Sequence, residues 1–206
     1  MHRSYRVAIA DDNRSDLLLL REFVIRAGHE VLSEARSGEE LVRYCAAASP
    51  DLIITDICMA DLDGLDAVHR ILSYQEIPVI IVSGLDIEYF LDHADTCRLL
   101  AYLTKPFRED ELRAAIVVAM QRFEELQSCR NETLSMRQAL EDRKIIERAK
   151  GLLMRQRSID EQTAFQCLQK LARRHRQKLV DVANSLILAE QALIASIEND
   201  PPLTGG

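Results

Sequence analysis

The sequence predicts an α/β fold: a doubly wound, five-stranded parallel sheet, followed by a helical connector and a small three-helix domain. Three observations lead to this prediction. Short apolar runs alternate with amphipathic stretches before residue 123, the runs are apolar on both faces, and no strand pattern follows Pro106. Strands of this kind are covered by helices on both sides, and their ligand site lies at the carboxyl ends of the strands.

Each predicted strand is short and is followed by a stretch with helical spacing. After the first strand, apolar side chains recur at Leu17, Leu20 and Val24, which places them on one face of a helix. This alternation indicates a parallel sheet wrapped by helices. The predicted strands are Tyr5–Ala10, His29–Glu34, Leu52–Thr55, Ile77–Val82 and Leu99–Leu103.

A long helical pattern begins at Glu109. Apolar residues follow at positions 112, 116, 119, 123 and 126, which is the spacing of a coiled-coil seam. We expect Leu112 to Ala119 to pack on the sheet, and the residues from Phe123 onward to pair with a second copy of the chain. The seam then weakens, because its next positions are Arg130, Thr133 and Arg137. Residues 124–136 are therefore predicted to form a helical, partly coiled-coil connector.

The remaining chain reads as a small helical domain over residues 137–194. Its predicted helices are Arg137–Arg155, Asp160–Arg174 and Lys178–Ile194, with Asp160 as a helix-start signal. Residues 195–206 lack core-forming side chains beyond the first few positions and are predicted to be a disordered tail.

Composition indicates a soluble cytoplasmic protein. No apolar run approaches the roughly 20 residues that span a bilayer, and no signal peptide is recognised. Cys45, Cys58, Cys97, Cys129 and Cys167 occur singly, without C-x-x-C spacing, which favours reduced thiols over a disulfide framework or a zinc site.

Charge divides the chain into an acidic and a basic part. Residues 1–122 contain 13 Lys and Arg against 21 Asp and Glu, a net charge of −8, whereas residues 137–178 contain 12 against 5, a net charge of +7. The acidic part is suited to a metal site and the basic part to a polyanionic partner.

Five polar residues follow the predicted strands at the edge where ligands bind. Asp11 and Asp12 follow the first strand, Asp56 the third, Ser83 the fourth and Lys105 the fifth. Carboxylate oxygens in this number suit Mg²⁺. A carboxylate at Asp56 can attack a phosphoryl group, while Mg²⁺ and Lys105 neutralise the transferring oxygens. We therefore predict that Asp56 is a phospho-acceptor and that Ser83 and Lys105 bind the new phosphoryl group.

Residues 5–123 resemble the receiver domain of two-component response regulators, and we assign residues 1–123 to it. The resemblance is carried by Asp11-Asp12, by the stretch from Asp56 to Gly64, by Pro78–Gly84 and by Tyr102–Phe107. It implies a flavodoxin-like topology, phosphorylation of Asp56 by a sensor histidine kinase, a fourth Mg²⁺ ligand in the backbone carbonyl of Cys58, and a switch role for Tyr102. Ala60 in place of proline, and Arg98-Leu99 in place of Gly-Ala, depart from the family pattern.

A basic helix opens the C-terminal domain. Ile145, Ile146, Ala149, Leu152 and Leu153 share its apolar face, and Arg143, Lys150 and Gly151 are predicted on the opposite, outer face. Glycine within a helix costs about 1 kcal/mol relative to alanine, so Gly151 needs a reason. A close approach by nucleic acid and a tight crossing with a neighbouring helix explain it equally well.

Residues 137–190 resemble the ANTAR domain of transcription antitermination regulators. The run Ala149–Met154 carries the resemblance, together with Ala164-Phe165, Leu168, Leu171-Ala172, Leu179 and Val182-Ala183. It implies binding to RNA hairpins in leader transcripts, so that RNA polymerase reads through a terminator. Arg143, Lys150 and Gly151 are the first candidates for RNA contacts, with Arg173 and Arg174 second.

The sequence thus predicts a phosphorylation-controlled antiterminator that is a homodimer in its active state. The alternative is a DNA-binding response regulator, although no short glycine-bearing turn precedes a compact recognition helix. An enzyme is not expected, because no second catalytic constellation or phosphate-binding loop lies outside the receiver-like part.

Overall fold

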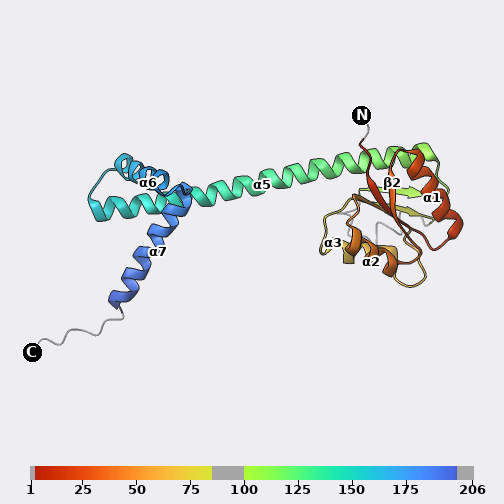
Figure 1. Cartoon of the computed structure of the whole chain (residues 1–206), viewed down its shortest axis with the longest axis horizontal. Helices are drawn as coiled ribbons and strands as arrows, with labels where there is room; N and C mark the ends of the chain where they lie inside the picture. The colour runs from red at the N-terminus through yellow and green to blue at the C-terminus, as the bar shows by residue number, and fades with distance from the viewer. Residues whose placement is uncertain (1–2, 85–99, 199–206) are drawn as a thin grey trace, which may run out of the picture. The chain divides into compact units, whose positions relative to one another are not determined.

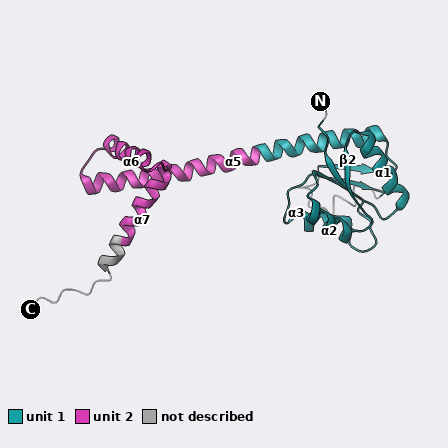
Figure 2. Cartoon of the chain, in the orientation of Figure 1, with its two compact units in different colours: residues 1–128 teal, residues 129–206 magenta. Residues whose placement is uncertain are grey.

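The computed structural model of the chain describes residues 3–84 and 100–198, with the side chains of residues 193–198 excepted. The chain divides into two compact units, Met1–Ser128 and Cys129–Gly206 (Figure 2). The domain limits at residues 123, 136 and 194 remain predictions. Cys97 and the Arg98-Leu99 pair lie outside the described residues, as does the tail from residue 199.

The first unit contains the predicted five-stranded parallel sheet, so the predicted fold class is confirmed. The strand order is β2-β1-β3-β4-β5, and every neighbouring pair is parallel. The chain continues from β1 to β2 on one side and then returns to β3 on the other side of β1, and this reversal opens a crevice at the carboxyl ends of β1 and β3. The strands are β1 (Arg6–Ala10), β2 (Glu30–Ala35), β3 (Leu52–Thr55), β4 (Val79–Ser83) and β5 (Ala101–Thr104).

Helices cover both faces of the sheet because successive strand residues point to opposite sides. Ala8, Ile53 and Ile81 pack against α2 (Gly38–Ala48) and α3 (Gly64–Leu72). Ile9 and Ile54 pack on the other face, against α1 (Arg14–Arg26) and the first part of α5 (Glu109–Arg157) (Figure 1). The inner strands β1, β3 and β4 are therefore apolar on both sides, as the sequence predicts, whereas the edge strand β2 is partly exposed.

Local signals at the helix starts position the chain around the carboxyl edge of the sheet. The side chain of Asn13 caps α1 by accepting from the Ser15 N–H, directly after the Asp11-Asp12 pair. The Gly64 N–H donates to the Ile57 carbonyl at 2.8 Å, and a side chain at Gly64 would collide with the backbone of Asp56. The close approach of α3 to the residues after β3 thus requires glycine.

The helix α5 is continuous over 49 residues, from Glu109 to Arg157. The sequence instead predicted a receiver helix, a connector and a separate output helix over Arg137–Arg155. No proline interrupts residues 109–157, and Gly151 is the one glycine there, so the polar seam at Arg130 and Thr133 weakens pairing without ending the helix.

The first part of α5 belongs to the core of the sheet. Leu112, Ile116 and Ala119 are buried against it, which confirms their predicted packing, and Phe123 also packs against this core. Phe123 stays partly exposed there, so the predicted pairing of Phe123 and the residues after it with a second copy remains a prediction. The first exposed seam residue is Leu126, at 56 % exposure.

The second unit contains the end of α5 with α6 (Glu161–His175) and α7 (Leu179–Glu198). Ala149 and Leu152 of α5 pack with Leu168 of α6 and with Val182 and Ile187 of α7. The helix α7 ends at Glu198, so the first four residues of the predicted tail are helical instead. The first helix-breaking residue there is Pro201.

Two further predictions were made from composition. Cys45, Cys58, Cys129 and Cys167 are free thiols, as expected from their scattered positions. Within the described ranges, no helix combines the length and the apolar character that a bilayer span requires.

Candidate functional site

Register in the sheet brings the predicted carboxylates together. Ala10 of β1 pairs with Thr55 of β3, so the residues that follow, Asp11 and Asp56, leave the sheet side by side. One oxygen from each of Asp11, Asp12 and Asp56 lies within 4.8 Å of the others. Asp11 and Asp56 are buried, while Asp12 is exposed. This acidic cluster could hold a metal ion.

The carboxylate of Asp56 is held in one orientation by its own loop. Its Oδ1 accepts the backbone N–H groups of Ile57 at 2.6 Å and Cys58 at 3.2 Å. Its Oδ2 accepts from the Lys105 ammonium at 2.7 Å. Cys58 therefore lies directly beside the cluster, and the role of its carbonyl oxygen as a metal ligand stays a prediction.

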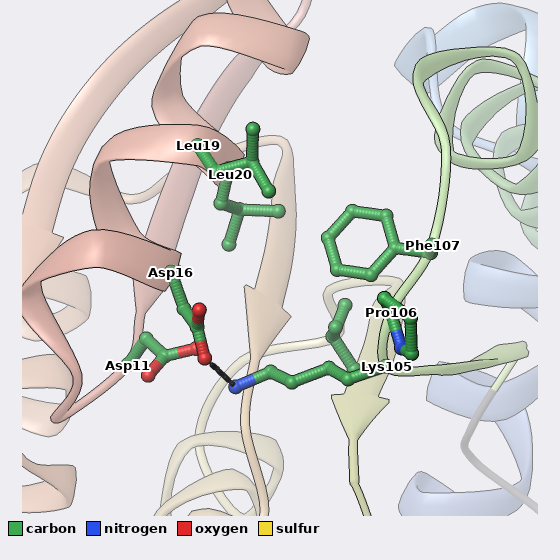
Figure 3. A pocket seen from close by; sticks show the side chains of 8 residues that line it. Asp11, Asp16, Leu19, Leu20, Lys105, Pro106 and Phe107 are labelled. Carbon is green, nitrogen blue, oxygen red and sulfur yellow. Dashed lines mark hydrogen bonds and ion pairs between the residues drawn. The ribbon is translucent and has the colours of Figure 1, made fainter.

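Lys105 enters the site because β4 and β5 end together. Ser83 pairs with Thr104, and the Lys105 N–H donates to the Ser83 carbonyl at 2.8 Å. The Lys105 ammonium lies 2.6 Å from Asp11 Oδ2 and 3.0 Å from Asp16 Oδ2 (Figure 3). These two contacts add to the one with Asp56. Burial alone would lower the pKa of Lys105, but these hydrogen bonds outweigh it and raise the pKa, so the ammonium stays charged.

Sequence reasoning missed Asp16, the third carboxylate on Lys105. It lies in the first turn of α1, one helical turn beyond the Asp11-Asp12 pair. An acidic residue in a first turn is common because of the helix dipole, so its position alone gives no signal. The sequence does give one indication that Asp16 belongs to the site. Asp16 follows Asp11 by little more than one helical turn, so the start of α1 holds it near the same edge of the sheet.

Electrostatics make the cluster receptive to a cation. Burial raises the pKa of Asp11, although Lys105 and the Asn13 N–H partly offset this. Burial raises the pKa of the Cys58 thiol, and the negative charges of Asp56, Asp63 and Asp12 raise it further. A set of hard carboxylate oxygens with a single neighbouring ammonium fits Mg²⁺ and does not fit a soft metal.

The two remaining predicted switch residues flank the cluster. Ser83 is the last residue of β4 and is fully buried. Tyr102 lies in β5 and packs, half-buried, against the core on the α2 and α3 side of the sheet. The structure thus places Ser83 and Lys105 at the same edge of the sheet, and Tyr102 within β5, before that edge.

A cavity of about 210 Å³ adjoins the site (Figure 3). Asp11, Asp16 and Lys105 form its polar end. Apolar side chains form the other walls, among them Leu19, Leu20, Val82, Pro106 and Phe107.

In the second unit, the predicted placement of Lys150 on the outer face of the helix is wrong. Its side chain is 8 % exposed, and its ammonium lies 2.9 Å from Glu147 and 2.6 Å from Glu161. The same ammonium lies 5.9 Å from the centre of the Phe165 ring. The hydrogen bonds to Glu161 and Glu147 raise the pKa of Lys150. Lys150 thus joins α5 to the first turns of α6.

We expect Lys150→Ala to lower the melting temperature of the second unit by about 4 °C or more, because it removes the ionic link between α5 and α6 and leaves two glutamates unpaired. Lys144→Ala is the matched control, since Lys144 pairs with Glu141 on the exposed surface of the same helix. Thermal unfolding followed by circular dichroism measures both. Unchanged melting together with weakened RNA binding would return Lys150 to the set of RNA contacts.

The surroundings of Gly151 separate the two explanations offered for it. A side chain added there would meet no atom of the described structure within 4 Å. A tight crossing between helices of this chain therefore does not explain the glycine. The approach of another molecule remains as the explanation that the geometry favours.

Several arginines of the second unit are exposed and unpaired. No ion pair is found in the described residues for Arg143, Arg148, Arg173 or Arg174, and all four side chains are exposed. Arg143 lies on α5, whereas Arg173 and Arg174 lie in the last turn of α6. Lys144 and Lys150 are instead held by glutamates, whereas these four arginines carry positive charge that no ion pair of the described residues neutralises.

Two family models match the chain. Residues 7–117 match the response regulator receiver domain, and residues 135–187 match the ANTAR domain. The second match supports the RNA-binding alternative over the DNA-binding one.

Full-length and receiver-like relatives agree with this division. The transcriptional regulatory protein PdtaR of Mycobacterium tuberculosis is 34 % identical over 182 residues, which are 88 % of this chain and 89 % of PdtaR. The chemotaxis protein CheY of Thermotoga maritima is 28 % identical over 112 residues, which are 54 % of this chain and 93 % of CheY.

Solved structures match the first unit. A receiver domain of a modulated diguanylate cyclase from Desulfovibrio desulfuricans has a TM-score of 0.55 at 29 % identity, covering 59 % of this chain and 98 % of that one. The response regulator PhyR from Brucella abortus has a TM-score of 0.57 at 27 % identity, covering 64 % and 54 %. The chain belongs to the response regulators in which a receiver domain is joined to an ANTAR RNA-binding antitermination module.

Proposed function

We propose that Asp56 accepts a phosphoryl group from a sensor histidine kinase and that this reaction controls RNA binding by the ANTAR module. The observation that carries the proposal is the convergence of three carboxylates and one lysine at the carboxyl edge of the sheet. An Asp56 oxygen attacks the phosphorus of the phosphohistidine, the bond from phosphorus to the imidazole nitrogen breaks, and an acyl phosphate forms.

The residues around Asp56 fit this reaction. Asp11, Asp12, Asp56 and the backbone carbonyl of Cys58 would hold Mg²⁺, which neutralises charge on the transferring oxygens. The N–H groups of Ile57 and Cys58 orient the Asp56 carboxylate by holding its Oδ1. Lys105 places a positive charge beside Oδ2. In this proposal Asp11 and Asp12 are ligands only, whereas Asp56 is both a ligand and the acceptor.

The predicted switch residues would respond to the phosphoryl group on Asp56. The Ser83 hydroxyl and the Lys105 ammonium would bind phosphoryl oxygens, which draws the ends of β4 and β5 toward Asp56. Tyr102 lies in β5 and would follow this movement toward the core. The proposed output is a changed surface of the receiver that acts on self-association of the chain.

The proposed RNA surface uses the exposed arginines of the ANTAR module. Arg143, Arg173 and Arg174 would contact phosphates and bases of an RNA hairpin, and Gly151 would let the RNA backbone approach α5 closely. Lys150 contributes by holding α6 on α5. RNA polymerase is a further partner in this proposal, because antitermination acts on the transcribing enzyme.

We expect Arg143→Ala and Arg173→Ala each to weaken RNA binding and to reduce its salt dependence by roughly one phosphate contact. Melting temperature should stay unchanged, because neither side chain is paired or buried. Arg122→Ala is the control, since it removes the same charge from the exposed surface of α5 within the receiver. Fluorescence anisotropy with a hairpin RNA at several salt concentrations measures the effect. Unchanged affinity in both variants would place the RNA elsewhere on the module.

A direct test compares a hairpin RNA with duplex DNA at one salt concentration, with and without an acyl-phosphate mimic. We expect the chain to bind the RNA more tightly than the DNA, and we expect the mimic to increase the affinity for RNA. Equal binding to duplex DNA would restore the DNA-binding alternative, and an absent response to the mimic would remove phosphorylation as the control.

A further inference from the structure

Asp16 uses the third donor of the Lys105 ammonium. An ammonium has three N–H donors, and Asp11, Asp56 and Asp16 accept at 2.6, 2.7 and 3.0 Å. Asp11 and Asp56 also belong to the group of carboxylates that could hold a metal, whereas Asp16 does not. Asp16 therefore touches the site through the lysine.

Asp16 is not needed as the cap of its helix. The side chain of Asn13 already accepts the Ser15 N–H at the start of α1. Leu19 and Leu20 line the cavity next to Asp16 and Lys105, so part of the surroundings of this ion pair is apolar. Its carboxylate remains 39 % exposed, which moderates the strength of the pair.

The ammonium and a dication compete for the same carboxylates. Lys105 occupies Oδ2 of both Asp11 and Asp56, the two buried members of the metal cluster. Two cations that share these groups repel each other at short range, and this repulsion opposes metal binding. A carboxylate that contacts the lysine and lies outside the metal cluster offsets the charge of the ammonium.

We propose that Asp16 is a positioning residue that neutralises and holds the Lys105 ammonium, so that a divalent cation and the lysine can use Asp11 and Asp56 together. The inference rests on the proposed metal-dependent phosphorylation of Asp56. In this arrangement the charges of Asp11, Asp12 and Asp56 neutralise the dication, and the charge of Asp16 neutralises the Lys105 ammonium. Asp16 sets the affinity of the site for the cation without being one of its ligands.

The test measures Mg²⁺ binding to the full chain by isothermal titration calorimetry. Asp16→Asn preserves the shape of the side chain and removes its charge. We expect Mg²⁺ to bind roughly threefold to tenfold more weakly to this variant, by the Coulomb energy of one partly screened charge. Asp16→Glu keeps the charge and should recover at least part of the affinity. Glu22→Gln removes an exposed charge from the same helix and should bind Mg²⁺ as the unmodified chain does.

Phosphorylation by a small acyl phosphodonor gives a second measurement. The rate for Asp16→Asn should be reduced at low Mg²⁺ and restored when Mg²⁺ is raised, because the defect lies in cation affinity. Mg²⁺ binding equal to that of the unmodified chain would overturn the proposal. A reduced rate that no Mg²⁺ concentration restores would also overturn it, because Asp16 would then act on the transfer itself. Absence of Mg²⁺ binding in the unmodified chain would instead refute the proposed function.

Discussion

We expect Asp56→Ala to abolish phosphate incorporation from a small acyl phosphodonor. Asp56 is the carboxylate that is buried, oriented by two backbone N–H groups and contacted by Lys105. Asp11 is turned toward Lys105 and the Asn13 N–H, and Asp12 is exposed. Within the metal cluster, neither Asp11 nor Asp12 is therefore held as Asp56 is. Intact-mass spectrometry after reaction with the phosphodonor measures the loss.

The control for this variant is Asp66→Ala, which removes an exposed carboxylate from the first turn of α3 and should be labelled normally. In addition, Asp12→Ala should be labelled slowly and without dependence on Mg²⁺, because it removes a proposed metal ligand and retains the acceptor. Unchanged labelling of Asp56→Ala would remove Asp56 from the acceptor role.

The second large effect concerns an apolar stripe on α5 made of Leu126, Leu134, Met136 and Leu140. These side chains are between 56 % and 60 % exposed. Leu126 and Leu140 lie on nearly the same side of the helix, two heptads apart, with Leu134 and Met136 on either side of them. Residues 128–141 are exposed throughout. An isolated helix of that length is marginal in water, so pairing with a second copy would stabilise it.

We propose that phosphorylation strengthens this pairing and that the pair of ANTAR modules binds RNA. The variant Leu126→Glu/Leu140→Glu should weaken self-association in the presence of an acyl-phosphate mimic by at least about tenfold, because it places like charges across the seam. RNA affinity should fall with it, since two linked modules bind more tightly than one. Sedimentation velocity and RNA anisotropy measure the two effects.

Ser128→Glu/Ser135→Glu is the matched control, because it adds the same charge to the opposite, exposed side of the same helical segment. It should associate and bind RNA like the unmodified chain. If the leucine variant also behaves like the unmodified chain in both states, the helix is a passive spacer and the coupling must run through direct contact of the two domains.

Sequence was sufficient to predict which residues meet at the carboxyl edge of the sheet. Parallel strands end at a common edge, so residues that directly follow strands converge whatever the loops between them do. This rule correctly predicted that four residues lie together, namely Asp11, Asp56, Ser83 and Lys105. It says nothing of residues inside helices, which is why Asp16 was missed although it contacts the same lysine.

Helical periodicity was less informative in the ANTAR module. It separates an apolar from a polar face, but Lys150 lies at the border, where a long side chain can reach acidic partners on its own helix and on the next one. Only tertiary contacts show that it is buried. The seam spacing of α5 likewise continues without a break through Phe123. Spacing alone therefore does not predict which seam residues pack on the sheet and which are exposed, because this depends on where the sheet ends.

The exposed middle of α5 also bears on how the chain unfolds. Residues 128–141 have no buried side chain, so this segment of a single copy contributes no apolar burial that couples the unfolding of one domain to that of the other. If the connecting helix is the whole link, we expect receiver and ANTAR module to be separate cooperative units, each with its own free energy of unfolding. A substitution that melts the ANTAR module should leave a folded receiver that can still accept phosphate. Pairing along the stripe would end this independence and make the stability of both domains depend on protein concentration.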